Sequence, residues 1–169
     1  TVMVTGASSG LGEAFARALA PRVRKLILVA RREDRLVELL AELMAAHGTL
    51  EEVRVCRVDL SDVNERERLV EEEAGSVDVL VNNAGLGDYG DFSGSEWTRT
   101  SAMLEVNIAA VTRLAHGVLP GMRARGAGVI ALAQFSLARA AGAVHAATGL
   151  PVLTTPGSAV RALRRRLAA

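Results

Sequence analysis

Short apolar runs alternate with helix-like stretches along almost the whole chain, and this alternation restricts the fold more than any other feature. The expected strands cover residues 2–5, 25–30, 53–58, 77–81 and 151–155, with another beginning at 129. The expected helices cover about 10–20, 33–47, 62–73, 103–124 and 134–147, with a last helix closing the chain. Such alternation is typical of right-handed βαβ units around a parallel sheet. The sequence therefore predicts an α/β fold with a doubly wound parallel sheet in three αβα layers.

Hydrophobic periodicity distinguishes the two kinds of element. Apolar residues in the stretch 33–47 recur at helical spacing, at Leu36, Leu39, Leu40, Leu43 and Met44. The run at 77–81 is almost continuously apolar, as in a strand covered on both faces. We find no internal repeat, low-complexity segment or linker, so a single domain is expected over residues 1–169.

The turn between the first strand and the first helix is rich in glycine. It runs from Thr5 to Gly12. Glycine lets the backbone turn sharply and lets a ligand approach it closely. The first N–H groups of a helix lack intrahelical acceptors and attract anions. This geometry predicts a pyrophosphate-binding turn in a Rossmann-like fold, formed by Gly6, Ser8, Ser9, Gly10, Leu11 and Gly12.

Polar residues follow the second and third strands, and ligands of doubly wound sheets bind at the carboxyl ends of the strands. Arg31 and Arg32 stand where an NAD site usually carries Asp or Glu, and arginine suits a 2′-phosphate instead. We therefore predict NADP rather than NAD as the cofactor, with two merely solvated arginines as the alternative. Asp59, followed by Leu60, could accept a hydrogen bond from an adenine amino group or serve as a turn residue.

Two further groups of residues carry amide side chains. In the stretch Asn82–Gly85, the compact polar side chains, Asn83 included, can tie neighbouring strands together, and Gly85, after Ala84, permits close approach of a ligand. Asn107 lies in an otherwise apolar helical stretch, and a buried amide needs partners. It is either an active-site residue or a satisfied core asparagine.

Charge and cysteine content exclude several classes of function. The net charge is +1, and the one basic cluster, 161–166, is interpreted as the solvated face of a terminal helix, so no nucleic-acid partner is expected. We expect no membrane partner, because no apolar stretch looks long enough to cross a bilayer and no signal peptide opens the chain. Cys56 is the only cysteine, which excludes an intrachain disulfide, predicts no metal site and favours a cytoplasmic location.

Taken together, these motifs resemble the short-chain dehydrogenase/reductase (SDR) family over residues 1–158. The matching positions are the turn Thr5–Gly12, the pair Asp59–Leu60, the stretch Asn82–Gly85, Asn107, and the pair Pro156–Gly157. The resemblance implies hydride transfer between NADP(H) and a small-molecule carbonyl or alcohol. It implies that Asn107 is an active-site residue that positions a water, and that Pro156 and Gly157 contact the cofactor. It also implies a homodimer or homotetramer formed through the helices at 103–124 and 134–147.

The sequence departs from the family at the residues that move the proton. The family uses a serine and a tyrosine that is followed four residues later by a lysine. Tyr89 is the only tyrosine and Lys25 the only lysine, so this pattern cannot exist in the chain. Ser136 and His145 fall at positions that do not match the catalytic serine and tyrosine.

We interpret the lack of the serine and of the Tyr-x-x-x-Lys pattern as a sign that active-site segments of the protein are absent from the printed chain. These segments would fall near 130–134 and 158–161. The alternative is a non-catalytic, dinucleotide-binding relative that lacks these residues. A structural subdomain with a decayed site is disfavoured, because the glycine turn is intact. Tyr89, Phe92 and Trp97 are candidates for a substrate wall or for packing of a surface turn.

Overall fold

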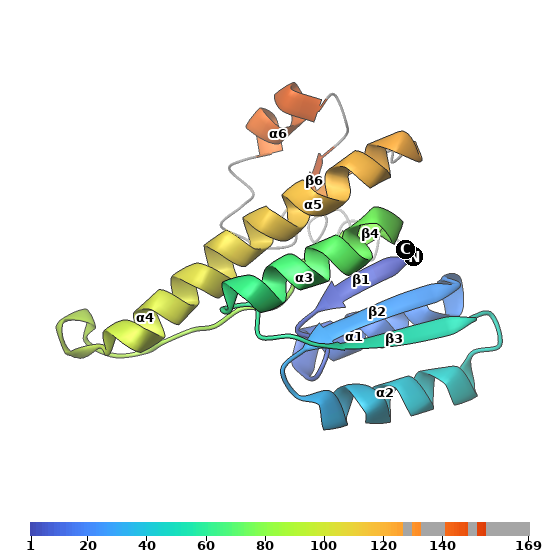
Figure 1. Ribbon diagram of the computed structural model, residues 1–169, viewed down its shortest axis with the longest axis horizontal. Coiled ribbons are helices and arrows are strands. Elements are labelled where there is room, and N and C mark those ends of the chain that lie inside the picture. The colour runs from blue at the N-terminus through green and yellow to red at the C-terminus, as the bar shows by residue number, and fades with distance from the viewer. Residues whose placement is uncertain (127–129, 133–140, 149–151, 155–169) are drawn as a thin grey trace, which may run out of the picture. The chain divides into compact units, whose positions relative to one another are not determined.

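The structure is a computed structural model that describes residues 1–126, 130–132, 141–148 and 152–154. The chain divides into two compact units, Thr1–Arg125 and Gly126–Ala169. The first unit holds a four-stranded sheet with helices on both faces (Figure 1). The α/β class and the parallel sheet predicted from the sequence are therefore confirmed.

The sheet of the first unit is wholly parallel, and the order in which its strands are added reverses at its middle. Its strands are β1 (Val2–Thr5), β2 (Lys25–Ala30), β3 (Glu52–Arg57) and β4 (Val79–Val81), in the order β3-β2-β1-β4. Strands β2 and β3 extend from one side of β1, whereas β4 pairs with its other side. The reversal between β1 and β4 opens a crevice at the carboxyl ends of these strands, where doubly wound sheets bind ligands.

The helices of the first unit follow the predicted order. They are α1 (Gly10–Leu19), α2 (Glu33–Ala46), α3 (Val63–Glu73) and a long helix made of α4 (Trp97–Leu104), η4 (Glu105–Ala110) and α5 (Val111–Ala124). Single 3₁₀ turns form η1 (Ala20–Arg22), η2 (Ala74–Ser76) and η3 (Phe92–Gly94). The long helix begins at Trp97, six residues before the predicted start. The prediction missed these residues because the first turn of this helix is largely polar and carries no apolar stripe. Its middle segment, η4, is π-helical.

Alternate side chains of the strands face two separate cores. Leu26 and Leu28 of β2 are fully buried against α1 and α2, whereas Ile27 and Val29 are fully buried against α3 and the long helix. Burial of a side chain of this size contributes about 1.5–3 kcal/mol. This alternation confirms the predicted three αβα layers, which are visible as α2 and α3 on opposite sides of the sheet (Figure 1).

The described part of the second unit consists of two strands and one helix. Strand β5 (Ile130–Leu132) pairs in parallel with β6 (Val152–Thr154), and α6 covers Ala141–Thr148. Strands were predicted in both places. The pair Pro156–Gly157, the last helix, residues 133–134 and the segment 158–161 lie outside the described residues. The predictions made there, and the extent of the domain, therefore stay predictions.

One expectation about apolar length is wrong. The helix Trp97–Ala124 contains an 18-residue window of mean hydropathy 1.2, so by length and composition it could cross a membrane. The window passes this test because small and aliphatic residues offset few charges. One row of this helix, comprising Val106, Ala110, Leu114 and Val118, belongs to the core over the sheet. Of the apolar window as a whole, 22% is buried in the described part of the chain.

Candidate functional site

A cleft of about 290 Å³ lies at the carboxyl ends of the strands of the first unit. Its lining residues are Gly6, Ser8, Ser9, Val29, Ala30, Arg31, Arg32, Val58, Asp59, Leu60, Asn83, Ala84, Gly85, Leu86 and Val106. Most of the predicted cofactor-binding residues are thus brought together. Gly10, Leu11 and Gly12 do not line the cleft, and the side chain of Leu11 is exposed. The sequence did not single out Leu86 and Val106, because apolar residues of these types look like ordinary core.

The glycines of the turn serve different purposes. Gly6 has φ +68° and Gly10 has φ +59°, in the region that side chains rarely adopt. A Cβ on Gly12 would overlap the carbonyl oxygen of Gly6 and would lie 2.6 Å from Nδ2 of Asn83. Gly12 therefore lets the first turn of α1 pack against the protein's own backbone.

The amino terminus of α1 offers donors to an anion. Its N-cap residue, Ser9, is extended, and its side chain makes no capping hydrogen bond. Among the described residues, no side chain accepts from the first N–H groups of α1, and the helix dipole adds partial positive charge beside them. A phosphate group satisfies both conditions.

Thr5 joins the end of β1 to the stretch after β4. Its fully buried hydroxyl accepts hydrogen bonds from the backbone N–H of Asn83 (2.9 Å) and Ala84 (3.0 Å), and it donates to the carbonyl of Val81 (3.3 Å). Nδ2 of Asn83 returns a hydrogen bond to the Thr5 carbonyl at 3.0 Å. This confirms the expected tie between strands. The prediction omitted Thr5 from the site, although a hydroxyl at the end of an apolar strand is a usable signal.

Asn107 lies in the π-helical segment η4 and holds the cleft wall through a reciprocal pair of hydrogen bonds. Its Oδ1 accepts from the backbone N–H of Leu86 at 2.9 Å, and its Nδ2 donates to the Leu86 carbonyl at 2.7 Å. π-Helical turns inside α-helices occur often at functional sites. The Asn107 amide is thus satisfied by backbone, as a core asparagine would be, and it also positions the stretch that follows Gly85.

The two arginines that follow β2 also line the cleft. Arg32 donates from Nη2 to the carbonyl and hydroxyl of Ser8, both at 3.2 Å. Arg31 is 61% exposed, and its Nη1 lies 4.0 Å from Oδ2 of Asp59. Arg32 is therefore anchored to the glycine turn, whereas the guanidinium of Arg31 is held only loosely.

Asp59 is held as a carboxylate. Partial burial opposes its ionisation, but hydrogen bonds from the hydroxyl and backbone N–H of Ser61, with the charge of Arg31, lower its pKa below the ordinary value. The backbone N–H of Asp59 donates to Oε2 of Glu65 at 2.6 Å. Asp59 therefore serves as a turn residue and also presents its carboxylate to the cleft, so it fits both interpretations that the sequence left open.

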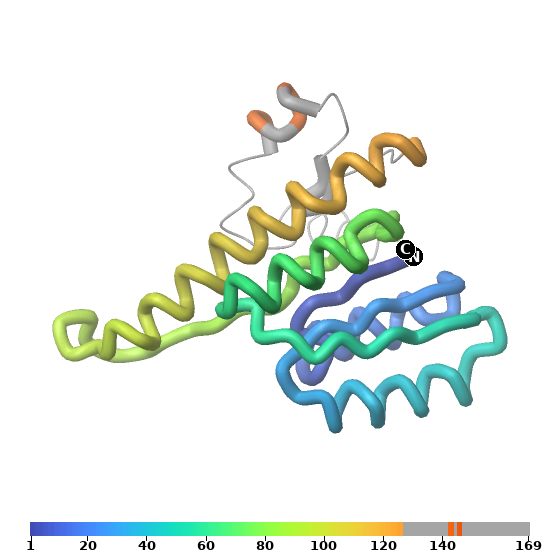
Figure 2. Tube along the Cα trace, viewed as in Figure 1, coloured from blue at the N-terminus to red at the C-terminus, as the bar shows by residue number. Residues whose placement is uncertain are grey.

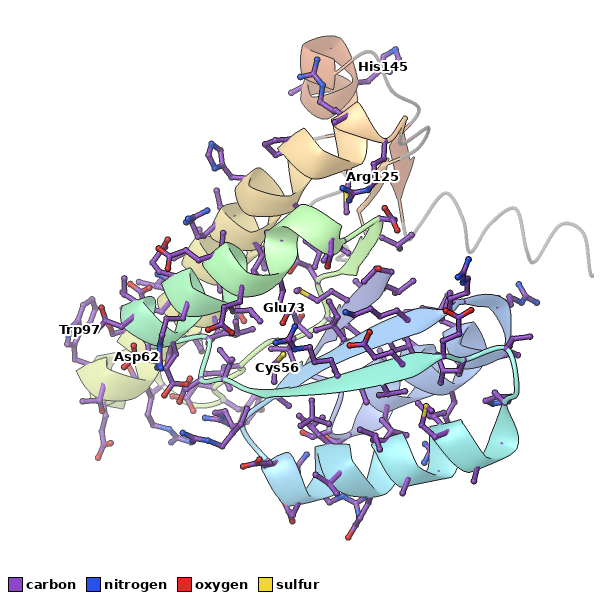
Figure 3. All side chains as sticks on the ribbon, turned by 45° about the vertical axis from the view of Figure 1, so that its right-hand side comes forward. Cys56, Asp62, Glu73, Trp97, Arg125 and His145 are labelled. Atoms are coloured by element: carbon purple, nitrogen blue, oxygen red, sulfur yellow. The ribbon has the colours of Figure 1, made fainter. Side chains whose placement is uncertain are left out.

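The remaining reactive side chains lie elsewhere. Figure 3 shows Cys56 of β3 near Glu73 of α3, where burial and the negative charge of Glu73 raise the pKa of the thiol to about 11. Lys25 lies at the amino end of β2 and pairs with Glu52 at 3.0 Å. Within the described ranges, no group of three or more His, Cys, Asp or Glu side chains could hold a metal ion.

The segment between β4 and α4 extends away from the sheet (Figure 2). Tyr89, Phe92 and Trp97 in or beside it are all strongly exposed, and Figure 3 shows Trp97 at the outer end of the helix. Residues of this segment and of α4 line a second hollow of about 500 Å³, which includes Tyr89 and Phe92. Their role as substrate wall or surface packing stays a prediction.

Comparisons with family models, with curated proteins and with solved structures all indicate the same family. The family model described as short chain dehydrogenase matches residues 1–147. An uncharacterised oxidoreductase of Mycobacterium tuberculosis is 34% identical over 137 residues, covering 78% of this chain and 53% of the relative. The chain thus spans about half the length of such relatives.

Solved structures with the same fold include two complexes with a nucleotide. A short-chain dehydrogenase from Sphingobium yanoikuyae in complex with NADPH is 33% identical, with a TM-score of 0.71 over 78% of this chain and 52% of that one. L-Sorbose reductase from Gluconobacter frateurii, complexed with NADPH and L-sorbose, is 34% identical, with a TM-score of 0.71 over 82% of this chain and 53% of that one.

Proposed function

Because the chain belongs to the short-chain dehydrogenase/reductase family, we propose that the protein transfers hydride between NADP(H) and a small-molecule carbonyl or alcohol. The observation that carries the proposal is the pair Arg31 and Arg32, which borders the same cleft as an intact glycine turn. An NAD site would carry a carboxylate where these arginines stand. The relatives that hold NADPH support the choice of this cofactor.

The cleft offers a place for each part of NADP(H). The uncapped start of α1 and the turn at Gly6 would hold the pyrophosphate. Arg31 and Arg32 would contact the 2′-phosphate, for which a guanidinium is suited by its fixed charge and paired donors. Asp59 and Leu60 would border the adenine, and the stretch 83–85 the nicotinamide half. When bound, the nicotinamide supplies or accepts the hydride, and the chain orients it.

The proton chemistry requires residues beyond the described cleft. We propose that the protein carries its catalytic serine, tyrosine and lysine in a segment that is absent from the printed chain near 130–134. A second absent segment, near 158–161, would hold the loop that covers the substrate. Asn107 would act by positioning the cleft wall and a water, and Pro156 and Gly157 would contact the cofactor. The second candidate is a non-catalytic dinucleotide-binding relative, favoured by one fact: the printed chain contains no Tyr-x-x-x-Lys.

Two measurements on the same preparation of the full-length protein separate these candidates. Oxidation of NADPH is followed at 340 nm with a panel of ketones and aldehydes, and NADPH binding is measured by calorimetry. Turnover with at least one carbonyl, together with binding, supports the oxidoreductase. Tight binding without turnover supports the non-catalytic relative, and absence of binding contradicts both.

The setting of the protein is also a proposal. We propose a cytoplasmic homodimer or homotetramer, with no nucleic-acid or membrane partner. The single cysteine is consistent with a reducing compartment. Leu104 and Ile108 on the long helix are exposed apolar residues that a second copy could cover. Light scattering after gel filtration would give the mass of the assembly, and a monomer would contradict the proposed oligomer.

A further inference from the structure

A buried arginine outside the cleft connects two of its walls. Arg66 of α3 is only 5% exposed, and its Nη1 donates to the carbonyl of Leu60 and to Oε2 of Glu105, both at 3.0 Å. Leu60 lines the cleft after β3, and Glu105 opens η4 on the long helix. Figure 1 shows α3 running beside this helix.

The connection ends on residues that shape the cleft. Val106, the neighbour of Glu105, lines the cleft, and the next residue, Asn107, holds Leu86 by two hydrogen bonds. One guanidinium nitrogen thus contacts the adenine-side wall and the segment that fixes the nicotinamide-side wall. A shift of Arg66 would therefore move both walls relative to each other.

The burial of Arg66 costs free energy of desolvation that packing alone does not require. A buried guanidinium loses hydration, and an apolar side chain of similar size often serves stability as well or better. The Nε of Arg66 is also buried and has no hydrogen-bond partner among the described residues. Stability alone therefore does not account for this residue.

We propose that Arg66 is a positioning residue for the cofactor cleft, which fixes the Leu60 carbonyl against η4 through Glu105. The proposal rests on the proposed function, since it assigns the cleft to NADP(H). It predicts that breaking the Arg66–Glu105 pair weakens nucleotide binding beyond its effect on folding.

The chain provides a matched control in a second ion pair between the same two helices. Arg113 of α5 donates from Nε to both carboxylate oxygens of Glu67 on α3, at 2.8 and 2.9 Å. Both partners are partly exposed, and neither lines the cleft. Loss of this pair weakens helix contacts without acting on Leu60 or η4.

The test compares Glu105→Gln with Glu67→Gln in the full chain. We expect Glu105→Gln to raise the Kd for NADPH about tenfold, within the range of coupling between linked sites, and Glu67→Gln to change it less than about twofold. Equal Kd values in the two variants would overturn the proposal. Thermal unfolding of both variants shows whether they differ in stability, so that a difference in Kd can be separated from a difference in folding.

A double variant separates positioning from stability. Arg66→Met combined with Glu105→Met removes the buried charge of Arg66 together with its part-exposed partner, so its Tm should recover toward that of the wild type. We expect its NADPH affinity to stay about tenfold weaker, because the Leu60 carbonyl and η4 are no longer joined. Recovery of affinity together with Tm would show a merely structural role and overturn the proposal.

Hydrogen exchange gives a readout that needs no nucleotide. The Leu86 N–H donates to Asn107, so it should exchange faster in Glu105→Gln than in Glu67→Gln. If the wild type binds no NADPH but this difference appears, the proposed function fails while the positioning role stands. Identical exchange of the Leu86 N–H in both variants would contradict the positioning role.

Discussion

Two neighbouring parts of the cleft wall are built in opposite ways, and we name them the turn end, around Gly6, and the arginine end, around Arg31 and Asp59. At the turn end, backbone meets backbone so closely that a Cβ on Gly12 would overlap the Gly6 carbonyl oxygen. At the arginine end, Arg31 is 61% exposed, and Asp59 lies 4.0 Å from its guanidinium. We therefore expect the turn end to maintain the cleft and the arginine end to set the preference between nucleotides. Substitutions at the two ends should separate folding from specificity.

The largest effect is expected at the turn end, from Gly12→Ala. The new methyl would overlap the Gly6 carbonyl and the Asn83 amide, and we expect a loss of about 3 kcal/mol or more in the free energy of unfolding. Gly10→Ala is the control, because its Cβ has open space and only the positive φ opposes it, at about 1–2 kcal/mol. Urea unfolding measures both. Equal losses would mean that the close approach at Gly12 is unimportant.

A smaller loss of stability is expected from Thr5→Val, which removes the hydroxyl that joins β1 to the stretch after β4. The N–H groups of Asn83 and Ala84 lose their acceptor, and we expect a cost of about 2–3 kcal/mol. Thr5→Ser keeps the hydroxyl and should cost about 1 kcal/mol, for one lost methyl. Chemical denaturation of the two variants gives the comparison. A serine variant as unstable as the valine variant would show that packing, not hydrogen bonding, is responsible.

The smallest effect is expected at the arginine end, from Asp59→Asn. Because the folded protein lowers the pKa of Asp59, the charged carboxylate stabilises the fold above the ordinary aspartate pKa of about 4. This contribution is lost as the pH falls through the lower pKa of the folded state. We expect the variant to be less stable at neutral pH by under about 1 kcal/mol, since solvent screens this part-exposed group.

Thermal unfolding of wild type and Asp59→Asn across pH 2–7 would measure this difference, which should vanish at the acid end of the range. A difference that persists unchanged at the lowest pH would mean that the charge of Asp59 is not its source.

Most of the fold could be predicted because its signals are local. The strand at 25–30 was predicted with the bounds that the structure has, since a continuous apolar run ends at two arginines. The early start of the long helix at Trp97 was missed, because WTRTSA carries no apolar periodicity. The π-helical segment around Asn107 has no sequence signal of its own.

The residues that line the cleft were predictable where a motif reports backbone geometry or where a polar residue follows a strand. The turn at Gly6 and the stretch 83–85 are of the first kind, and Arg31 and Asp59 are of the second. Arg66 was not found, because an arginine in the charged run Glu65–Glu67 looks exposed until tertiary structure buries it. Contacts between residues far apart in sequence, such as Arg66 with Glu105, leave no pattern in a single sequence.

The most direct test of the central claim is the ratio of affinities for NADPH and NADH, measured by calorimetry in the wild type, Arg31→Ala and Arg35→Ala. Arg35 pairs with Glu38 on α2 and does not line the cleft, so its variant controls for the loss of one charge. We predict that the wild type and Arg35→Ala prefer NADPH and that Arg31→Ala loses about tenfold of that preference, equivalent to about 1.4 kcal/mol. A wild type that binds NADH as tightly as NADPH, or a ratio unchanged by Arg31→Ala, would contradict the account.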